Sequence, residues 1–116
     1  MSAGLTTHVL DTSREGPAEG VAVTLDRVDD SGGTEPIASG TTNDDGRLDE
    51  PLLTGSELEP GTYELTFDVG PYYEKTGTAS TFLETVPVRF VVSEPDEHYH
   101  VPLLLSPGGY TTYRGS

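Results

Sequence analysis

Two histidines near the end of the chain, His98 and His100, stand two residues apart in a run of alternating residue types. Because side chains alternate between the two faces of a β-strand, this run predicts a strand with chemically opposite faces. His98 and His100 share one face, where an imidazole can take up a proton or bind a ligand near neutral pH. The other face is apolar and belongs in a core; it comprises Tyr99, Val101, Leu103 and Leu105.

A third histidine, His8, lies in a similar pattern near the N-terminus. We expect a strand over residues 5–11 that directs Val9 inward and places His8 and Leu10 on the opposite face. His98 and His100 also have metal-ligand spacing, and His8 could supply a third ligand. Such spacing is common, and no residue nearby in the sequence stands out as a partner that would orient the imidazoles. General-base chemistry and divalent-metal binding both remain open on these residues.

Arginine is the other residue type with ligand-binding chemistry in this chain. Arg47 follows the turn sequence Asn-Asp-Asp-Gly at residues 43–46, and only 6 residues of the chain are Lys or Arg. A planar guanidinium suits an anionic or carbonyl-rich ligand, whereas a salt bridge to an acidic neighbour is the alternative for Arg47. Arg114 has the corresponding alternative of pairing with the C-terminal carboxylate.

Other catalytic chemistries have no support in the sequence. The chain has no cysteine, which excludes a disulfide framework and a thiolate nucleophile. No serine occurs in a G-x-S-x-G setting, and no glycine-rich loop opens a helix to hold a phosphate.

The charge balance is strongly acidic, with 20 acidic against 6 basic residues and a formal net charge of −14. Nucleic acid and anionic membrane surfaces are poor partners for such a chain, so we expect neither. A halophilic or high-salt habitat fits this composition, since salt screens the self-repulsion. No apolar run approaches the length of a membrane span, and no secretory signal is evident, so we expect a cytoplasmic protein.

Short alternating runs between glycines and prolines predict an all-β domain that spans residues 1–116. We expect strands over residues 5–11, 20–29, 35–41, 61–69, 86–92, 97–105 and 110–114. Residues 71–77 predict one short helical turn, the only helix expected. These strands would bring the histidines to the surface of a sandwich or barrel.

Four segments carry a resemblance to a known family. They are Leu5-Thr-Thr-His-Val-Leu-Asp11 followed by Gly16-Pro-Ala, Thr42-Asn-Asp-Asp-Gly-Arg47, His98-Tyr-His-Val-Pro-Leu-Leu-Leu-Ser-Pro107, and the ending Tyr113-Arg-Gly-Ser116. On these segments the chain resembles the transthyretin-like family, and within it the enzymes that hydrolyse 5-hydroxyisourate. The ending is the most specific of the four, because the hormone-carrying transthyretins lack it and also lack the paired histidines.

The resemblance implies a β-sandwich of two four-stranded sheets with one short helix, assembled as a homotetramer that is a dimer of dimers. It also implies that the channel of the tetramer is lined by the outward faces of the first strand and the last two strands. Carried over residue by residue, the catalytic positions fall on His8, Arg47 and His100. The substrate-binding positions fall on His98, Tyr113, Arg114, Gly115 and Ser116.

The implied reaction opens the six-membered ring of 5-hydroxyisourate and yields 2-oxo-4-hydroxy-4-carboxy-5-ureidoimidazoline in urate catabolism. A neutral imidazole of His8 or His100 would take a proton from the attacking water. Arg47, with Arg114, would orient the substrate and stabilise the developing oxyanion. No metal or organic cofactor is expected.

Two alternatives belong to different function classes. One is a non-catalytic module that binds a small aromatic ligand in the same channel; it does not require the Tyr-Arg-Gly-Ser ending. The other is a divalent-metal binder that uses His8, His98 and His100.

Overall fold

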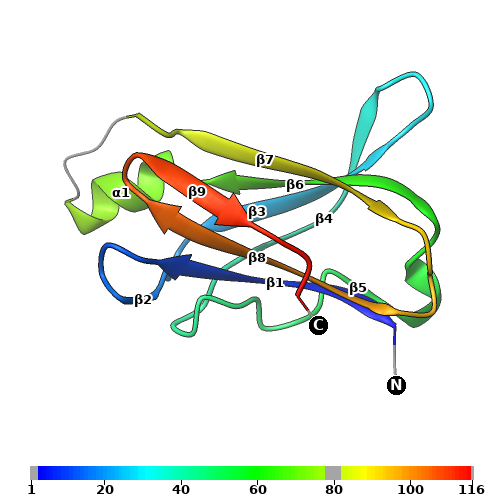
Figure 1. Cartoon of the computed structure of the whole chain (residues 1–116), viewed down its shortest axis with the longest axis horizontal. Coiled ribbons are helices and arrows are strands. Elements are labelled where there is room, and N and C mark those ends of the chain that lie inside the picture. The colour runs from blue at the N-terminus through cyan, green and yellow to red at the C-terminus, as the bar shows by residue number, and fades with distance from the viewer. Residues whose placement is uncertain (1–2, 78–81, 116) are drawn as a thin grey trace.

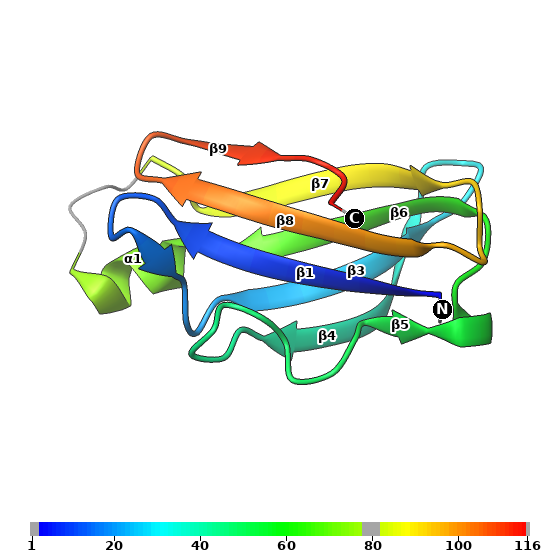
Figure 2. The same ribbon diagram turned by 60° about the horizontal axis from the view of Figure 1, so that its bottom comes forward.

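The chain folds as a sandwich of two β-sheets with a short helix at one end (Figures 1 and 2). The computed structural model describes residues 3–77 and 82–115. Its helical segments are the 3₁₀ turn η1 (Gly55–Glu57) and the helix α1 (Gly70–Thr76). Its strands are β1 (Gly4–Asp11), β2 (Gly16–Pro17), β3 (Ala22–Val28), β4 (Thr34–Thr41), β5 (Leu53–Thr54), β6 (Gly61–Asp68), β7 (Thr85–Val92), β8 (His98–Ser106) and β9 (Gly109–Thr112).

The two sheets have the orders β2-β1-β8-β9 and β4-β3-β6-β7, and the two-residue strand β5 also pairs with β1. β5 pairs with the beginning of β1 and β2 with its end, so these two pieces share one edge position. The expected sandwich with four strand positions in each sheet and one short α-helix is confirmed. The sequence did not predict β2, β5 or η1, because elements of two or three residues are too short to show periodicity.

The core between the sheets comes from alternating residues of the long strands. The predicted inward residues of the clearest strand, β6, have no exposed surface, as illustrated by Tyr63 and Phe67. On the other sheet, Val9, Leu103 and Leu105 are equally buried. The alternation in the sequence therefore identified the core faces correctly, and with them the outward faces.

The decisive pairing for function joins β1 to β8, near the two ends of the chain. These strands run parallel, and their register places Gly4 opposite His98, Thr6 opposite His100 and His8 opposite Pro102. Parallel neighbours need a long connection, which here is most of the chain. This pairing brings the two histidine-bearing strands together at the centre of one sheet (Figure 2).

A buried carboxylate attaches α1 to the end of β1. Tyr72 Oη donates a 2.6 Å hydrogen bond to Asp11 Oδ2, and the Ser13 hydroxyl and backbone amide donate to Asp11 Oδ1. Burial by itself would raise the pKa of Asp11, but these hydrogen bonds outweigh it and lower that pKa. Burial, together with the bond to Asp11, raises the pKa of Tyr72. The carboxylate is therefore ionised and satisfied, and it serves the fold.

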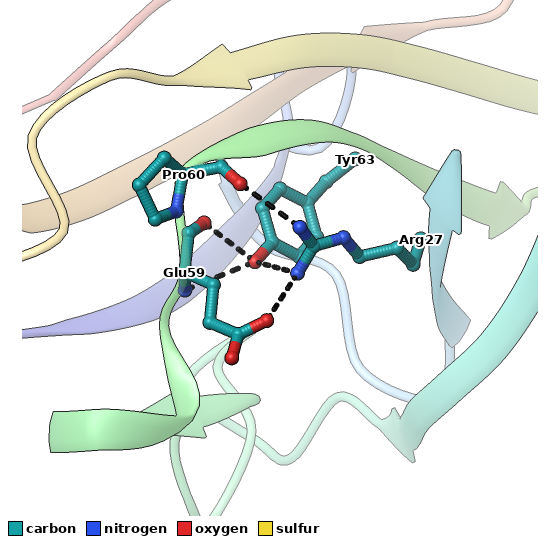
Figure 3. Close-up of polar contacts among 4 residues, drawn as sticks. All are labelled: Arg27, Glu59, Pro60 and Tyr63. Carbon is teal, nitrogen blue, oxygen red and sulfur yellow. Dashed lines mark hydrogen bonds and ion pairs between the residues drawn. The ribbon is translucent and has the colours of Figure 1, made fainter. Parts of the chain in front are cut away.

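A second polar cluster closes the opposite end of the sandwich around Arg27 (Figure 3). The Arg27 guanidinium donates to Glu59 Oε1 at 3.0 Å, to Tyr63 Oη at 3.1 Å and to the Pro60 carbonyl at 2.9 Å. Its central carbon also lies 5.1 Å from the centroid of the Tyr63 ring. Arg27 thus uses its donors on neighbouring protein groups, which is the arrangement of a structural arginine.

Candidate active site

The outward face of the β1–β8 pair carries the three histidines and a threonine. His8, His98, His100 and Thr6 are each partly buried, in contrast to the fully buried residues that alternate with them. The prediction that the imidazoles lie outside the core is confirmed. The face that they form is accessible to a small ligand in the single chain.

His8 contacts the turn that delivers Arg47. The two residues form an isolated antiparallel bridge, and His8 Nε2–H donates a 2.8 Å hydrogen bond to the Asp45 carbonyl. Because a carbonyl oxygen only accepts, this bond places a proton on Nε2 and leaves Nδ1 with the lone pair when the ring is neutral. The arrangement fixes both the ring orientation and the tautomer of His8.

The turn over residues 43–47 has little freedom to move. Asn43 Oδ1 accepts hydrogen bonds from the backbone amides of Asp45 and Arg47. Gly46 adopts φ 77°, and a Cβ there would collide with the Val9 carbonyl. A left-handed glycine is therefore required for this turn to lie against β1. The consequence is that Arg47 leaves the turn at a fixed place beside His8.

Thr6 links the other two histidines. Its hydroxyl oxygen lies 2.9 Å from His100 Nδ1 and 3.1 Å from His98 Nε2, within hydrogen-bond distance of both. A hydroxyl has one proton to donate and can accept another, so it can bond both rings at once. Since Thr6 occupies His100 Nδ1, the nitrogen of His100 available to a ligand is Nε2.

The electrostatic surroundings favour neutral His100. Burial, followed by the nearby charges of Arg47, His8 and His98, lowers the pKa of His100. The imidazole is therefore the neutral proton acceptor near pH 7. The same influences indicate that Arg47 and His8 face His100 across the site.

The C-terminal tail runs over His100. Gly115 and His100 form a bridge in which the Gly115 amide donates a 2.7 Å hydrogen bond to the His100 carbonyl. A Cβ added to Gly115 would lie only 2.8 Å from His100 Cδ2, the ring carbon next to Nε2. Gly115 is thus needed for close packing against the ring, a role that the sequence did not reveal.

Arg114 and Tyr113 have different surroundings from Gly115. The Arg114 guanidinium donates to Glu97 Oε1 at 2.9 Å, and its central carbon lies 4.1 Å from the centroid of the Tyr99 ring. These contacts anchor the tail to β8 and to the segment before it. Tyr113 is 57% exposed. Ser116 lies outside the described residues.

Arg47 is exposed and, among the described residues, no carboxylate lies within ion-pair distance of its guanidinium. The alternative that Arg47 serves as a salt-bridge residue therefore has no support in residues 3–77 and 82–115. An unpaired guanidinium close to three imidazoles forms a locally basic site on a chain of net charge −14. Such a site suits an anionic or carbonyl-rich ligand.

The metal-binding alternative gains nothing from the geometry. In the part of the chain that the structure describes, no group of three or more His, Asp or Glu side chains is arranged to hold a metal ion. The described helices also include none with the length and apolarity of a membrane span.

The structure therefore brings together His8, Arg47, His98, His100 and Gly115. It adds Thr6, which the sequence reading missed as a site residue. The signal was available, because Thr6 stands two residues before His8 and so shares its face. What the alternation did not reveal was that Thr6 lies directly opposite His100.

Comparisons with known proteins agree with this geometry. The family model described as the HIUase/Transthyretin family matches residues 5–115. A protein of Halalkalibacterium halodurans named 5-hydroxyisourate hydrolase is 53% identical, and the match covers 100% of both chains. The solved structure of (S)-allantoin synthase matches 99% of this chain with 45% identity and a TM-score of 0.93, and the match covers 44% of that longer chain. Sea bream transthyretin, solved in complex with thyroxine, is 32% identical, with a TM-score of 0.88 and coverage of 97% and 95% of the two chains.

Proposed function

The chain belongs to the HIUase/Transthyretin family, and from that membership we propose that it hydrolyses 5-hydroxyisourate in urate breakdown. The observation that carries the proposal is the site itself: neutral His100, flanked by His8 and Arg47, on the outward face of β1 and β8. Full-length identity of 53% to a protein named for this activity supports it.

The reaction adds water to a ring carbonyl and breaks the adjacent C–N bond, which opens the six-membered ring. His100 Nε2 takes a proton from the water as its oxygen attacks the carbonyl carbon. The same nitrogen then returns the proton to the departing ring nitrogen. The product carries a carboxylate and a ureido group, and no atom is supplied by a cofactor.

Arg47 stabilises the oxygen that becomes negative when water adds. Its unpaired guanidinium offers donors at a place where charge develops, and such preorganised donors contribute strongly to catalysis. His8, whose Nε2 proton is engaged by the Asp45 carbonyl, presents Nδ1 as an acceptor that orients the substrate or the water. His98 supports His100, and Tyr113, Arg114, Gly115 and Ser116 close the substrate pocket.

We propose that the active form is a homotetramer built as a dimer of dimers. In the single chain, the outward β1–β8 face lacks a cover that would exclude bulk water, and a second copy would supply one. β7 and β9 are edge strands of their sheets and lie on the same side of the sandwich (Figure 1). Val91 on β7 and Tyr110 on β9 are large exposed apolar residues, as expected where edges meet a second copy.

The proposal is tested by generating 5-hydroxyisourate in place with urate oxidase and following its ultraviolet absorbance. The assay is run in high-salt buffer that keeps the oxidase active, in which the tetramer is first verified by light scattering. Decay well above the spontaneous rate is the expected result. Decay at the spontaneous rate from verified tetramer would contradict the proposal.

The competing function is a binding module that holds a small aromatic ligand without turning it over. Sea bream transthyretin, the neighbour solved with thyroxine, is the observation in its favour. Removal of residues 113–116 separates the two functions. A carrier keeps its ligand after this truncation, whereas the hydrolase loses its rate.

The predictions of a high-salt habitat and a cytoplasmic location rest on composition alone. The net charge of −14 makes assembly of like-charged subunits salt-dependent, because repulsion has a longer range at low ionic strength. Sedimentation at low and high salt tests this expectation directly.

A further inference from the structure

Thr6 occupies a position that orientation of one histidine does not require. Its hydroxyl contacts two imidazoles, His100 Nδ1 at 2.9 Å and His98 Nε2 at 3.1 Å. Both rings come from β8, whereas Thr6 comes from β1, in the register that places it opposite His100. The three polar groups form a continuous hydrogen-bonded row along the outward face.

We propose that Thr6 is a positioning residue that relays a proton between His100 and His98 during hydrolysis. This inference rests on the proposed function, since it requires His100 to accept a proton at Nε2. In the resting site His100 Nδ1–H donates to Thr6 Oγ1, and the Thr6 hydroxyl donates to His98 Nε2. This assignment leaves the lone pair of His100 on Nε2, the nitrogen that faces the reaction.

The relay moves two protons and no other atom. When His100 Nε2 takes the proton of water, His100 becomes an imidazolium. Its Nδ1 proton passes to Thr6 Oγ1 while the hydroxyl proton passes to His98 Nε2. The positive charge then resides on His98, and His100 is neutral with its new proton on Nε2. The reverse shift accompanies transfer of that Nε2 proton to the departing ring nitrogen, and it restores the resting site.

The charges around His100 give the shift a direction. Arg47, His8 and His98 are the charged or titratable groups whose proximity disfavours imidazolium at His100, in addition to burial. Arg47 bridges to His8, which lies on the next rung of the β1–β8 ladder, and His98 lies one rung further away. Two residues of strand span about 7 Å, so the relay carries the charge away from Arg47 by roughly that distance.

The geometry around His98 is compatible with this role. The ring is partly buried, and its Nδ1 side faces Gly4, where an added Cβ would lie 3.6 Å from Nδ1. Gly4 also leaves room beside the Leu53 carbonyl, from which an added Cβ would be only 3.0 Å away. The absence of a side chain at Gly4 therefore leaves space for the ring that receives the charge.

Replacement of Thr6 by valine removes the hydroxyl and keeps the shape. We expect Thr6→Val to lower kcat about 10- to 100-fold with little change in KM, because loss of proton-transfer assistance acts on chemistry and not on binding. Thr6→Ser restores most of the rate, since it keeps the hydroxyl. Equal losses in the valine and serine variants would overturn the proposal.

Thr7→Val is the matched structural control. Thr7 is the neighbouring residue on the opposite, buried face, and its hydroxyl donates a 2.7 Å hydrogen bond to the Val101 carbonyl of the same partner strand. If loss of a hydroxyl between β1 and β8 acted only through the sheet, Thr7→Val would lower kcat as much as Thr6→Val. We expect it to lower the melting temperature and to keep kcat close to wild type.

His98→Gln separates proton relay from simple orientation. The glutamine oxygen can accept the Thr6 hydrogen bond, but the amide cannot take up a proton. The relay predicts that His98→Gln loses as much kcat as Thr6→Val and that the double variant loses no more than either single variant. A glutamine variant at full rate, or losses that multiply, would overturn it.

A ligand-free readout keeps this test independent of the enzymatic assay. In protein labelled with ¹⁵N-histidine, ring nitrogen chemical shifts report which nitrogen carries the proton. We expect His100 to carry its proton on Nδ1 in wild type and to lose that preference in Thr6→Val. A wild-type His100 protonated on Nε2 would overturn the relay even in an active enzyme, whereas failure of wild type to hydrolyse 5-hydroxyisourate would overturn the proposed function.

Discussion

Arg27 and Arg47 carry the same side chain in two contrasting environments. Arg27 is held by Glu59, Tyr63 and the Pro60 carbonyl at one end of the sandwich (Figure 3). Arg47 is held at its backbone by Asn43, while no described carboxylate pairs with its guanidinium. The first arrangement satisfies the donors and stabilises the fold, whereas the second keeps donors available for a ligand.

The histidine face shows the same principle. Hydrogen bonds to Asp45 and Thr6 hold one nitrogen each of His8 and His100. Each ring is thus fixed in orientation but retains a second nitrogen for chemistry. A site of this kind combines rigid support with unsatisfied reactive atoms, and the Arg27 cluster has only the support.

The largest expected effect comes from removing the base. His100→Asn keeps a polar group of moderate size but cannot accept the proton of water near pH 7. We expect kcat for 5-hydroxyisourate to fall about 100-fold or more while assembly is retained. Rate measurements together with light scattering check this, and a full-rate tetramer of the variant would reject His100 as the base.

The two arginines can be compared directly with matched substitutions. Arg47→Gln should lower kcat/KM about 100-fold, since it removes a charged donor to the developing oxyanion, and leave the melting temperature nearly unchanged. Arg27→Gln should do the reverse: activity at 25 °C is retained and the unfolding free energy falls by about 1–2 kcal/mol. Urea unfolding and steady-state kinetics on both variants provide the four values. Similar profiles for the two variants would contradict the contrast.

Two glycines of the C-terminal region provide the next comparison. An added Cβ at Gly115 meets the His100 ring, whereas at Gly108 it meets nothing within 4 Å. We expect Gly115→Ala to lower kcat about tenfold by displacing the ring or the tail, because small misplacements of a reacting group are costly. Gly108→Ala should retain the wild-type rate. If the alanine at position 115 left the rate unchanged, the tail would not position His100.

The smallest effect is a shift in pH dependence. The lowered pKa of His100 means that the neutral base persists below the ordinary histidine value of about 6.5, and activity is lost as pH falls through the lower, folded-state pKa. In the window between that pKa and about 6.5, the unfolded chain binds more protons, so the unfolding free energy also decreases as pH falls. Arg47→Gln removes one cause of the depression and should move the His100 titration upward, as measured by NMR. An unmoved titration would indicate that burial alone sets this pKa.

Much of the fold could be predicted from the sequence because its signals are local. The alternation in residues 61–69 and 97–105 identified buried faces that the structure confirms with Tyr63, Phe67 and Leu103. The short helix near residue 71 and the turn before Arg47 were also predicted correctly. Strands β2 and β5 were missed, since two residues show no period and they form only where β1 offers a free edge.

The candidate site divides in the same way. The sequence placed His8, His98 and His100 outside the core, and its resemblance to a known family added Arg47 and the ending Tyr113-Arg-Gly-Ser116. It did not predict that Thr6 joins two histidines or that Arg114 is anchored by Glu97 and Tyr99. The contribution of Arg114 to substrate binding stays a prediction.

By itself, the sequence determined which residues face the core and which face outward, because the alternation of side chains along a strand is a property of each strand alone. Only the tertiary structure decided which outward residues meet. The Thr6 hydroxyl reaches His98 and His100 across separations of 92 and 94 residues, and it does so through the parallel register of β1 and β8. A shift of one residue in that register would turn Thr6 and His8 toward the opposite face, since the side-chain period of a strand is two.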